Sequence, residues 1–250
     1  MIRCVALLYL AALLVVPVGM VFYRAFEEGV SPAWEAVTTP PAQHAFFLTI
    51  TIALIAVPLN AVFGVLTAWV LARYDFRGKR VLDVLIDLPF AVSPVIVGLA
   101  LILVWGRDGW FGSTEVIFST PGMVLATIFV SLPFVVREVL PVLEEEGTDS
   151  EQAAGTLGAR AWQVFWRITL PTIRWGLTYG VILSTARAIG EFGAVAVVSG
   201  KIQGRTETLT LYVEDRFQSL DLTGAYAAGV VLALLGVAVL ALMTLLQRRT

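Results

Sequence analysis

Arg187 and Glu191 are opposite charges in the stretch STARAIGEFGAVAVVSG, which belongs to an apolar run of the sequence. They stand four residues apart, so a helix would place both side chains on one face. Charged groups at membrane depth are costly and normally face the protein interior or an aqueous cavity. With the hydroxyls of Ser184 and Thr185 close by, these residues form a candidate anion site. The alternative is an ion pair that holds the helices together.

Few other residues have the types and spacing that chemistry requires. The chain has one cysteine, Cys4, and one histidine, His44, so neither an intrachain disulfide nor a Cys/His metal cluster is expected. The catalytic patterns H-E-x-x-H and G-x-S-x-G do not occur in the sequence. An intramembrane enzyme is therefore a disfavoured class.

The sequence also has no phosphate-binding loop of the form G-x-x-x-x-G-K-[ST]. The pair Gly78-Lys79 lacks the upstream glycine and the hydroxyl, and Gly200-Lys201 is followed by Ile202. We therefore expect no cofactor on this chain, and any nucleotide that drives its function would be bound by another protein.

The composition is that of a protein embedded in lipid. Hydrophobic residues make up 58% of the 250 positions and charged residues 14%, with a mean hydropathy of +0.85. These values are typical of a polytopic all-α membrane protein rather than of a soluble domain. The net charge of −2 gives no basic surface for nucleic acid.

Apolar runs long enough for a membrane-spanning helix predict six spans in a single transmembrane domain over residues 1–250. The first is interpreted as a retained span, not a cleaved signal peptide, because it is long and lacks a clear cleavage site. The fourth has a short apolar run before Arg137, so five spans is the alternative. The predicted spans are 4–23, 45–72, 84–105, 122–143, 175–199 and 223–246.

Lys and Arg residues gather on one side of this predicted topology, for example in Arg73, Arg77, Lys79 and Arg80. Positively charged loops stay in the cytoplasm, so both termini and residues 151–171 are predicted to be cytoplasmic. This arrangement requires an even number of spans and favours six.

Asp83 and Asp87 are also four residues apart. They follow the basic run 77–80, so helix-start electrostatics and a local ion-pair network with that run explain them adequately.

Residues 151–171, EQAAGTLGARAWQVFWRITLP, form a polar break between two very apolar regions. The T-x-x-E spacing of Thr148 and Glu151 predicts a capping box that starts a short helix. Gly158 is expected to end this helix, and a second helix would follow until Pro171 stops or kinks it.

Ala153 and Ala154 would give the first short helix a surface poor in side chains, which suits close approach of a partner's backbone. The alternative is an amphipathic helix at the membrane surface, anchored by tryptophans and arginines. Trp162, Phe165 and Trp166 would share one face of it, and Arg160, Arg167 and Arg174 another.

The pattern A-A-x3-G-x9-I-x-L-P is met by Ala153, Ala154, Gly158, Ile168, Leu170 and Pro171. It resembles the EAA loop of the membrane subunits of binding-protein-dependent ABC importers, which docks into a groove of the ATPase subunit. Gln152 occupies the position of the family's glutamate, and Glu151 precedes it. The resemblance implies that these eight residues couple this chain to an ATPase.

Three longer stretches, 87–101, 147–177 and 186–214, resemble the CysW-type permeases for sulfate and thiosulfate. This resemblance implies a bacterial inner-membrane importer that moves sulfate or thiosulfate, with ATP and Mg²⁺ on the partner ATPase. It further implies two ATPase copies, a second homologous permease and a periplasmic sulfate-binding protein. Molybdate and tungstate permeases share the scheme and remain an alternative, and a passive anion channel is a competing class.

Overall fold

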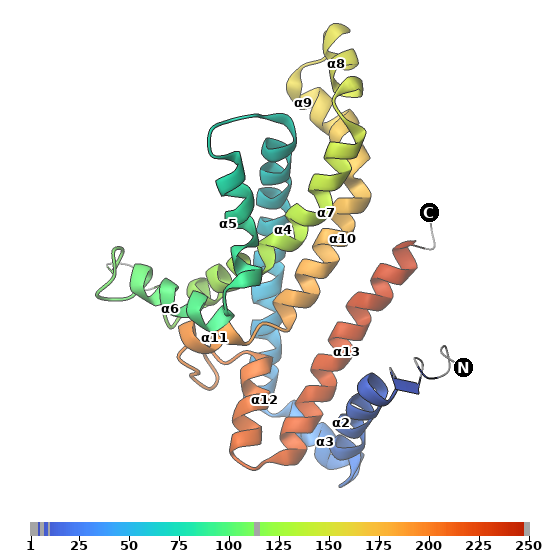
Figure 1. Cartoon of the computed structure of the whole chain (residues 1–250). Coiled ribbons are helices and arrows are strands. Elements are labelled where there is room, and N and C mark those ends of the chain that lie inside the picture. Colours follow the sequence, from blue (N-terminus) through green and yellow to red (C-terminus); the bar gives the residue numbers. More distant parts are fainter. Residues whose placement is uncertain (1–4, 6–7, 10, 113–115, 248–250) are drawn as a thin grey trace. The chain divides into compact units, whose positions relative to one another are not determined.

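The structure is a computed structural model that describes residues 5, 8–9, 11–112 and 116–247. Cys4, where the first predicted span begins, lies outside the described residues. Every regular element among the described residues is a helix, which confirms the all-α class (Figure 1). These residues form two compact units, which are described separately.

The first unit comprises residues 1–50 and 200–238. Its small core is formed by Ala42, Ala45, Leu209, Tyr212 and Ala228. Its elements are η1 (Ala11–Val15), α2 (Val16–Phe26), α3 (Val30–Thr38), the beginning of α4 (Pro40–Arg73), α12 (Leu209–Gln218) and most of α13 (Leu222–Gln247).

The second unit comprises residues 51–199 and 239–250. Its elements are the larger part of α4, α5 (Lys79–Ala91), α6 (Pro94–Trp105), α7 (Thr120–Glu146), α8 (Asp149–Thr156), α9 (Ala161–Val164), η2 (Phe165–Thr169), α10 (Leu170–Ile189) and α11 (Gly193–Val198).

The core of the second unit lies where α4, α7 and α10 pack together around Val135, Val139 and Ile173. Glycines allow this close approach. A Cβ atom at Gly64 would lie 2.7 Å from the side chain of Val135, and one at Gly180 would lie 2.8 Å from the Val135 Cα atom. Small residues at helix contacts are typical of membrane bundles, where packing replaces the hydrophobic driving force.

A polar contact also joins α4 to α7. The Asn60 side chain is fully buried, and its Nδ2 donates a hydrogen bond of 2.8 Å to the Ser131 hydroxyl. Pro58 lies two residues before Asn60 inside α4, which is nevertheless a single helix of 34 residues. Hydrogen bonds between helices are a common means of association at membrane depth.

The third predicted span, 84–105, is not one helix. The chain bends by 114° between α5 and α6, at Val92 and Ser93. Pro94 begins α6, and a residue before proline is disfavoured in the helical region, so Ser93 adopts an extended backbone (ψ 133°). The physical cause of the break is therefore present in the sequence, although hydropathy alone does not reveal it.

Three helices of the described chain are long and apolar enough to cross a membrane, and the bent pair of α5 and α6 would make four. They are Pro40–Arg73, Thr120–Glu146 and Leu222–Leu242. The helix α10 has 20 residues but does not meet the same criteria, and η1 with α2 forms a shorter apolar helix, Ala11–Phe26. The number six therefore stays a prediction.

Candidate coupling surface and pathway residues

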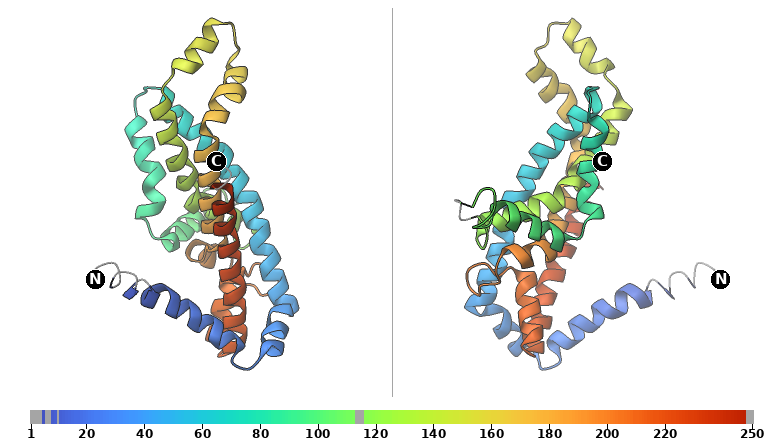
Figure 2. Two further views of the ribbon diagram at one scale, coloured as in Figure 1. Left: turned by 90° about the vertical axis from the view of Figure 1, so that its right-hand side faces the viewer. Right: turned by 60° about the vertical axis from the view of Figure 1, so that its left-hand side comes forward.

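The segment predicted to meet a soluble partner forms a helical hairpin, α8 and α9, at the far end of α7 and α10 (Figure 1). Two further views show it projecting beyond α4 and α5 at this end of the second unit (Figure 2). No residue of α8 is buried. The position suits contact with another protein, because little of the unit's own core covers α8.

The predicted capping box at the start of α8 is wrong. Thr148 is the N-cap residue, but its side chain makes no capping hydrogen bond. The Thr148 hydroxyl instead accepts a hydrogen bond from Gln152 Nε2 at 2.7 Å. The Glu151 carboxylate does not complete the capping box, because it accepts hydrogen bonds from Arg73 of α4 and Thr169 of η2.

Gly158 ends α8 through its backbone conformation. Its φ is +83°, which favours glycine because a Cβ atom is strained there. The Gly158 N–H donates to the Gly155 carbonyl and the Ala159 N–H donates to the Ala154 carbonyl, both at 3.0 Å. This pair of bonds is a Schellman motif, which satisfies the last carbonyls of the helix. The glycine of the A-A-x3-G pattern is thus favoured by the backbone conformation that ends α8.

The same turn leaves Leu157 at the tip of the hairpin with its side chain 88% exposed. An apolar side chain so fully exposed at the end of a projecting hairpin is available to a partner. Leu157 was not predicted as a site residue, although an apolar residue between the two alanines and Gly158 is visible in the sequence.

Of the remaining pattern residues in the first arm, Gln152 and Ala153 are exposed and Ala154 is half-buried. In the second arm Ile168 and Leu170 are half-buried, and Pro171 lies in the first turn of α10. The exposed pattern residues are Gln152 and Ala153 in α8, Gly158 just after it and Pro171 at the start of α10, whereas the half-buried Ile168 and Leu170 support the hairpin.

The second helix does not stop at Pro171. The backbone widens into the π-helical turn η2 just before it, and α10 then continues to Ile189. Such a turn is a known way to accommodate a proline without ending a helix.

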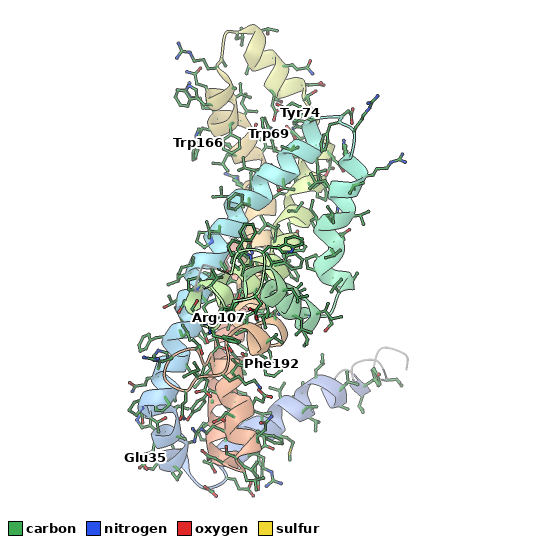
Figure 3. All side chains as sticks on the ribbon, turned by 90° about the vertical axis from the view of Figure 1, so that its left-hand side faces the viewer. Glu35, Trp69, Tyr74, Arg107, Trp166 and Phe192 are labelled. Atoms are coloured by element: carbon green, nitrogen blue, oxygen red, sulfur yellow. The ribbon has the colours of Figure 1, made fainter. Side chains whose placement is uncertain are left out.

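The predicted aromatic face divides between two environments. Trp162 and Trp166 are each 60% exposed, whereas Phe165 packs against the core of the second unit. Trp166 projects outward below the hairpin, and Trp69 and Tyr74 lie near the same end of α4 (Figure 3). The two exposed rings are compatible with a lipid or protein neighbour.

The Glu151 carboxylate is bound within the chain. Its Oε2 accepts a hydrogen bond of 3.0 Å from Arg73 Nε, and its Oε1 accepts bonds from Arg73 Nη2 (3.2 Å) and the Thr169 hydroxyl (2.8 Å). Two parallel bonds between a guanidinium and a carboxylate give the strongest and most directional form of ion pair. Arg73 was not predicted as a site residue, because nothing in the sequence connects positions 78 residues apart.

Arg187 Nη1 lies 2.6 Å from Glu191 Oε2. The two side chains differ in exposure, since Arg187 is 30% exposed and Glu191 only 2%. Glu191 does not lie on α10, which ends at Ile189. It stands in the break before α11, where its Oε1 accepts the Ala194 N–H at 2.9 Å. The Glu191 carboxylate therefore contacts both the Arg187 guanidinium and the backbone at the start of α11.

The two hydroxyls near Arg187 are placed differently. Ser184 is fully buried, and its Oγ has no hydrogen-bond partner among the described residues. The Thr185 hydroxyl donates to the Val181 carbonyl of its own helix at 2.7 Å. Of the four candidate anion-site residues, Arg187 combines positive charge with exposure.

Asp83 and Asp87 bind Arg137, not the basic run at 77–80. Arg137 Nε and Nη2 lie 2.7 and 2.6 Å from the two oxygens of Asp87, and Nη2 lies 2.8 Å from Asp83 Oδ1. The prediction that Asp83 and Asp87 pair with the basic run 77–80 is therefore wrong, because their partner is Arg137. The ion pairs connect α5 to α7 across 50 residues of sequence, a separation that charge spacing cannot reveal.

Glu207 lies in the loop between α11 and α12 and is 2% exposed. Burial, reinforced by the nearby negative charge of Asp215, raises the pKa of the Glu207 carboxyl to about 7, while Arg216 acts in the opposite direction. Its Oε2 has no hydrogen-bond partner among the described residues. Glu207 was not predicted, because the sequence does not reveal that its carboxyl is buried.

Residues 60–250 match the family of binding-protein-dependent transport system inner membrane components, and the chain belongs to this family. It is therefore an inner-membrane component of a transport system, with several apolar helices.

Comparison with individual proteins shows which members of this transport family the chain resembles. The sulfate transport system permease protein CysW of Synechocystis sp. is 54% identical over 251 residues, covering 98% of this chain and 91% of the relative. The protein of the same name from Escherichia coli strain K12 is 47% identical, covering 98% and 86%. These similarities confirm the resemblance to CysW-type permeases seen in the sequence.

Solved structures agree with the fold. A bacterial ABC transporter that imports the acidic polysaccharide alginate matches with a TM-score of 0.80 and 17% identity, over 98% of this chain and 92% of that chain. The same transporter in complex with an alginate pentasaccharide-bound periplasmic protein gives the same score over 99% and 93%. At this identity the likeness concerns the fold alone.

Proposed function

We propose that this chain is the CysW-type permease subunit of an ATP-driven importer that moves sulfate, and with it thiosulfate, across the bacterial inner membrane. The observation that carries the proposal is identity of 47–54% to sulfate permeases over nearly the whole of both chains. The family membership and the projecting α8–α9 hairpin support the same function.

The assembly would contain two ATPase copies, a second homologous permease and a periplasmic sulfate-binding protein. Six spans with both termini in the cytoplasm would place the α8–α9 hairpin on the side of the ATPase. ATP and Mg²⁺ would be bound by that partner, because this sequence has no phosphate-binding loop. Rigid-body motion of the hairpin would then convert ATPase closure into alternating access of the pathway.

The surface offered to the ATPase would be the exposed side of α8 and its tip, formed by Gln152, Ala153, Ala154, Leu157 and Gly158. The alanines and the glycine allow close approach of backbones, and Leu157 supplies an exposed apolar anchor. At protein interfaces a few residues that become fully buried account for most of the binding energy. Ile168, Leu170 and Pro171 would support this surface from the second arm.

Replacing Leu157 with Asp tests the docking surface. We expect Leu157→Asp to reduce the amount of ATPase that co-purifies with the permease by at least about tenfold, the effect of losing roughly 1.4 kcal/mol of binding free energy. Leu220→Asp is the matched control, because Leu220 is also exposed (83%) and lies outside the hairpin. Wild-type co-purification with Leu157→Asp, or an equal loss with Leu220→Asp, would contradict the assignment.

For the pathway, we propose that Arg187 contacts the anion while Glu191 fixes its position. A partly exposed guanidinium suits recognition of a tetrahedral oxyanion, and the Glu191 carboxylate would limit how tightly the anion is held. Ser184 and Thr185 would contribute less, since one is fully buried and the other is bonded to its own helix.

The double variant Arg187→Ala, Glu191→Ala tests this assignment. Sulfate uptake should fall at least about tenfold, because the charge that attracts the anion is lost. Uptake is measured at equal amounts of membrane-inserted complex. Normal uptake by the double variant would exclude both a pathway role and an essential ion pair.

A further inference from the structure

Arg73 is the last residue of α4, and its guanidinium is the centre of a small polar cluster at the base of the α8–α9 hairpin. The Arg73 side chain is only 9% exposed and that of its partner Glu151 is 18% exposed. An ion pair so little exposed is weakly screened by salt, and loss of one partner would leave an uncompensated charge. The cluster is therefore a fixed feature of the fold, unlike a pair on the surface.

The third donor of the guanidinium reaches a different helix. Arg73 Nη1 donates a hydrogen bond of 2.8 Å to the carbonyl oxygen of Leu143. Leu143 lies in the last turn of α7, where the carbonyls have no partner within the helix. One arginine thus holds the end of α7 and the beginning of α8 at the end of α4.

Thr169 adds a fourth element. It is 3% exposed, lies at the end of η2, and donates its hydroxyl hydrogen to Glu151 Oε1 at 2.8 Å. Glu151 consequently connects both arms of the hairpin to α4. Its two oxygens are engaged inside the chain, so Glu151 is not a free carboxylate for a partner.

This cluster matters because α8 has no buried residue of its own. A helix without an apolar core is positioned by its polar attachments and by its loops. Among the side-chain hydrogen bonds and ion pairs of the described residues, the pair of Arg73 and Glu151 is the one that links α8 directly to a long helix. The helix α4 has 34 residues and thus extends about 51 Å at 1.5 Å per residue.

We propose that Arg73, Glu151 and Thr169 form the joint through which movement of the hairpin is transmitted to α4. In this role Arg73 and Glu151 are positioning residues: they touch neither nucleotide nor anion, but they make the hairpin and α4 move as one body. The proposal rests on the proposed function, since it presupposes that an ATPase moves the hairpin.

The test uses the complete importer reconstituted in proteoliposomes with its ATPase, second permease and binding protein. Three variants are compared with the wild type: Arg73→Gln, Glu151→Gln and the double variant. For each, the amount of co-purified ATPase, the rate of ATP hydrolysis and the uptake of ³⁵S-sulfate are measured. The decisive quantity is sulfate taken up per ATP hydrolysed.

We expect both single variants to retain the ATPase and to hydrolyse ATP, while sulfate uptake per ATP falls at least about fivefold, the lower range of coupling effects. The double variant should show the same loss as each single variant, because the two residues act as one unit. Lys79→Gln is the control: it removes the exposed ion pair with Asp75, whose side chain is 99% exposed, and should leave the ratio unchanged.

Three results would overturn the proposal. The first is wild-type uptake per ATP in Glu151→Gln, and the second is a double variant whose loss is the product of the single losses. The third is loss of ATPase co-purification in Glu151→Gln, which would make Glu151 a docking residue. If the wild-type importer itself shows no ATP-dependent sulfate uptake, the proposed function fails instead, so the two failures are distinguishable.

Discussion

At the scale of single residues, two carboxylates of this chain meet opposite environments. Glu151 accepts hydrogen bonds from a guanidinium and a hydroxyl, which fix the position of its side chain. Glu207 is buried in the loop before α12 with one oxygen that lacks a hydrogen-bond partner among the described residues, and its pKa is raised to about 7. Glu151 holds α8 against the end of α4, and we expect Glu207 to make the stability of the fold depend on pH.

The pH dependence follows from the direction of this shift. Between pH 4.5 and about 7 the folded chain keeps a proton on Glu207 that the unfolded chain releases, so the free energy of unfolding decreases as pH rises through this window. Above pH 7 the charged carboxylate is buried, at a cost of about 1–3 kcal/mol. Glu207→Gln should remove this loss and raise Tm at pH 8.

The measurement is thermal unfolding of the purified permease in detergent at pH 5 and pH 8. The difference in Tm between the two pH values should be smaller in Glu207→Gln than in the wild type. Glu145→Gln, at an exposed position, should behave as the wild type does. An unchanged pH dependence in Glu207→Gln would show that Glu207 does not titrate in this range.

Residue spacing predicted some of these sites and could not predict others. The spacing of four between Arg187 and Glu191 pointed to their proximity, and their atoms lie 2.6 Å apart. Arg73 with Glu151 and Arg137 with Asp87 are separated by 78 and 50 residues. Such pairs depend on how helices pack, which a single sequence does not specify.

At the scale of helices, glycines determine how closely α4, α7 and α10 approach. Gly180 of α10 lies directly against the backbone of Val135. Gly236 of α13 is also a mid-helix glycine, but a Cβ atom there would meet nothing within 4 Å. Alanine substitutions at Gly180 and Gly236 therefore distinguish the effect of helix packing on stability from that of helix propensity.

Gly180→Ala should destabilise the permease by about 1–3 kcal/mol, because the added methyl group would lie 2.8 Å from the Val135 Cα atom and force the helices apart. Gly236→Ala should instead stabilise it by about 0.5–1 kcal/mol, because alanine loses less backbone entropy in a helix. Thermal unfolding of both variants in the same detergent measures the difference. Equal stability of the two variants would contradict the packing of α7 against α10.

Helix boundaries show where hydropathy is a good guide and where it fails. The fourth predicted span, 122–143, was doubtful because of Arg137, yet α7 runs without a break from Thr120 to Glu146. The charge is accommodated by Asp83 and Asp87 of α5. The third predicted span is broken because Pro94 makes the residue before it extended.

At the scale of the whole molecule, the sequence was sufficient for the all-α class, the family and the hairpin, since these depend on composition and on a spaced motif. The sequence was not sufficient for the number of spans. Three helices of the described chain are long and apolar enough to cross a membrane, and a fourth is so only if the bent pair counts as one span. The boundaries of the two compact units fall within α4 and α13, which hydropathy does not reveal.

The central claim is that this chain moves sulfate only when an ATPase drives it. The most direct measurement is uptake of ³⁵S-sulfate into proteoliposomes that contain the complete importer and the sulfate-loaded binding protein, with and without ATP inside. We expect uptake to require ATP, the ATPase and the binding protein, and to be abolished by excess unlabelled sulfate but not by molybdate. Sulfate flux through this chain alone, or ATP-driven uptake of molybdate in place of sulfate, would contradict it.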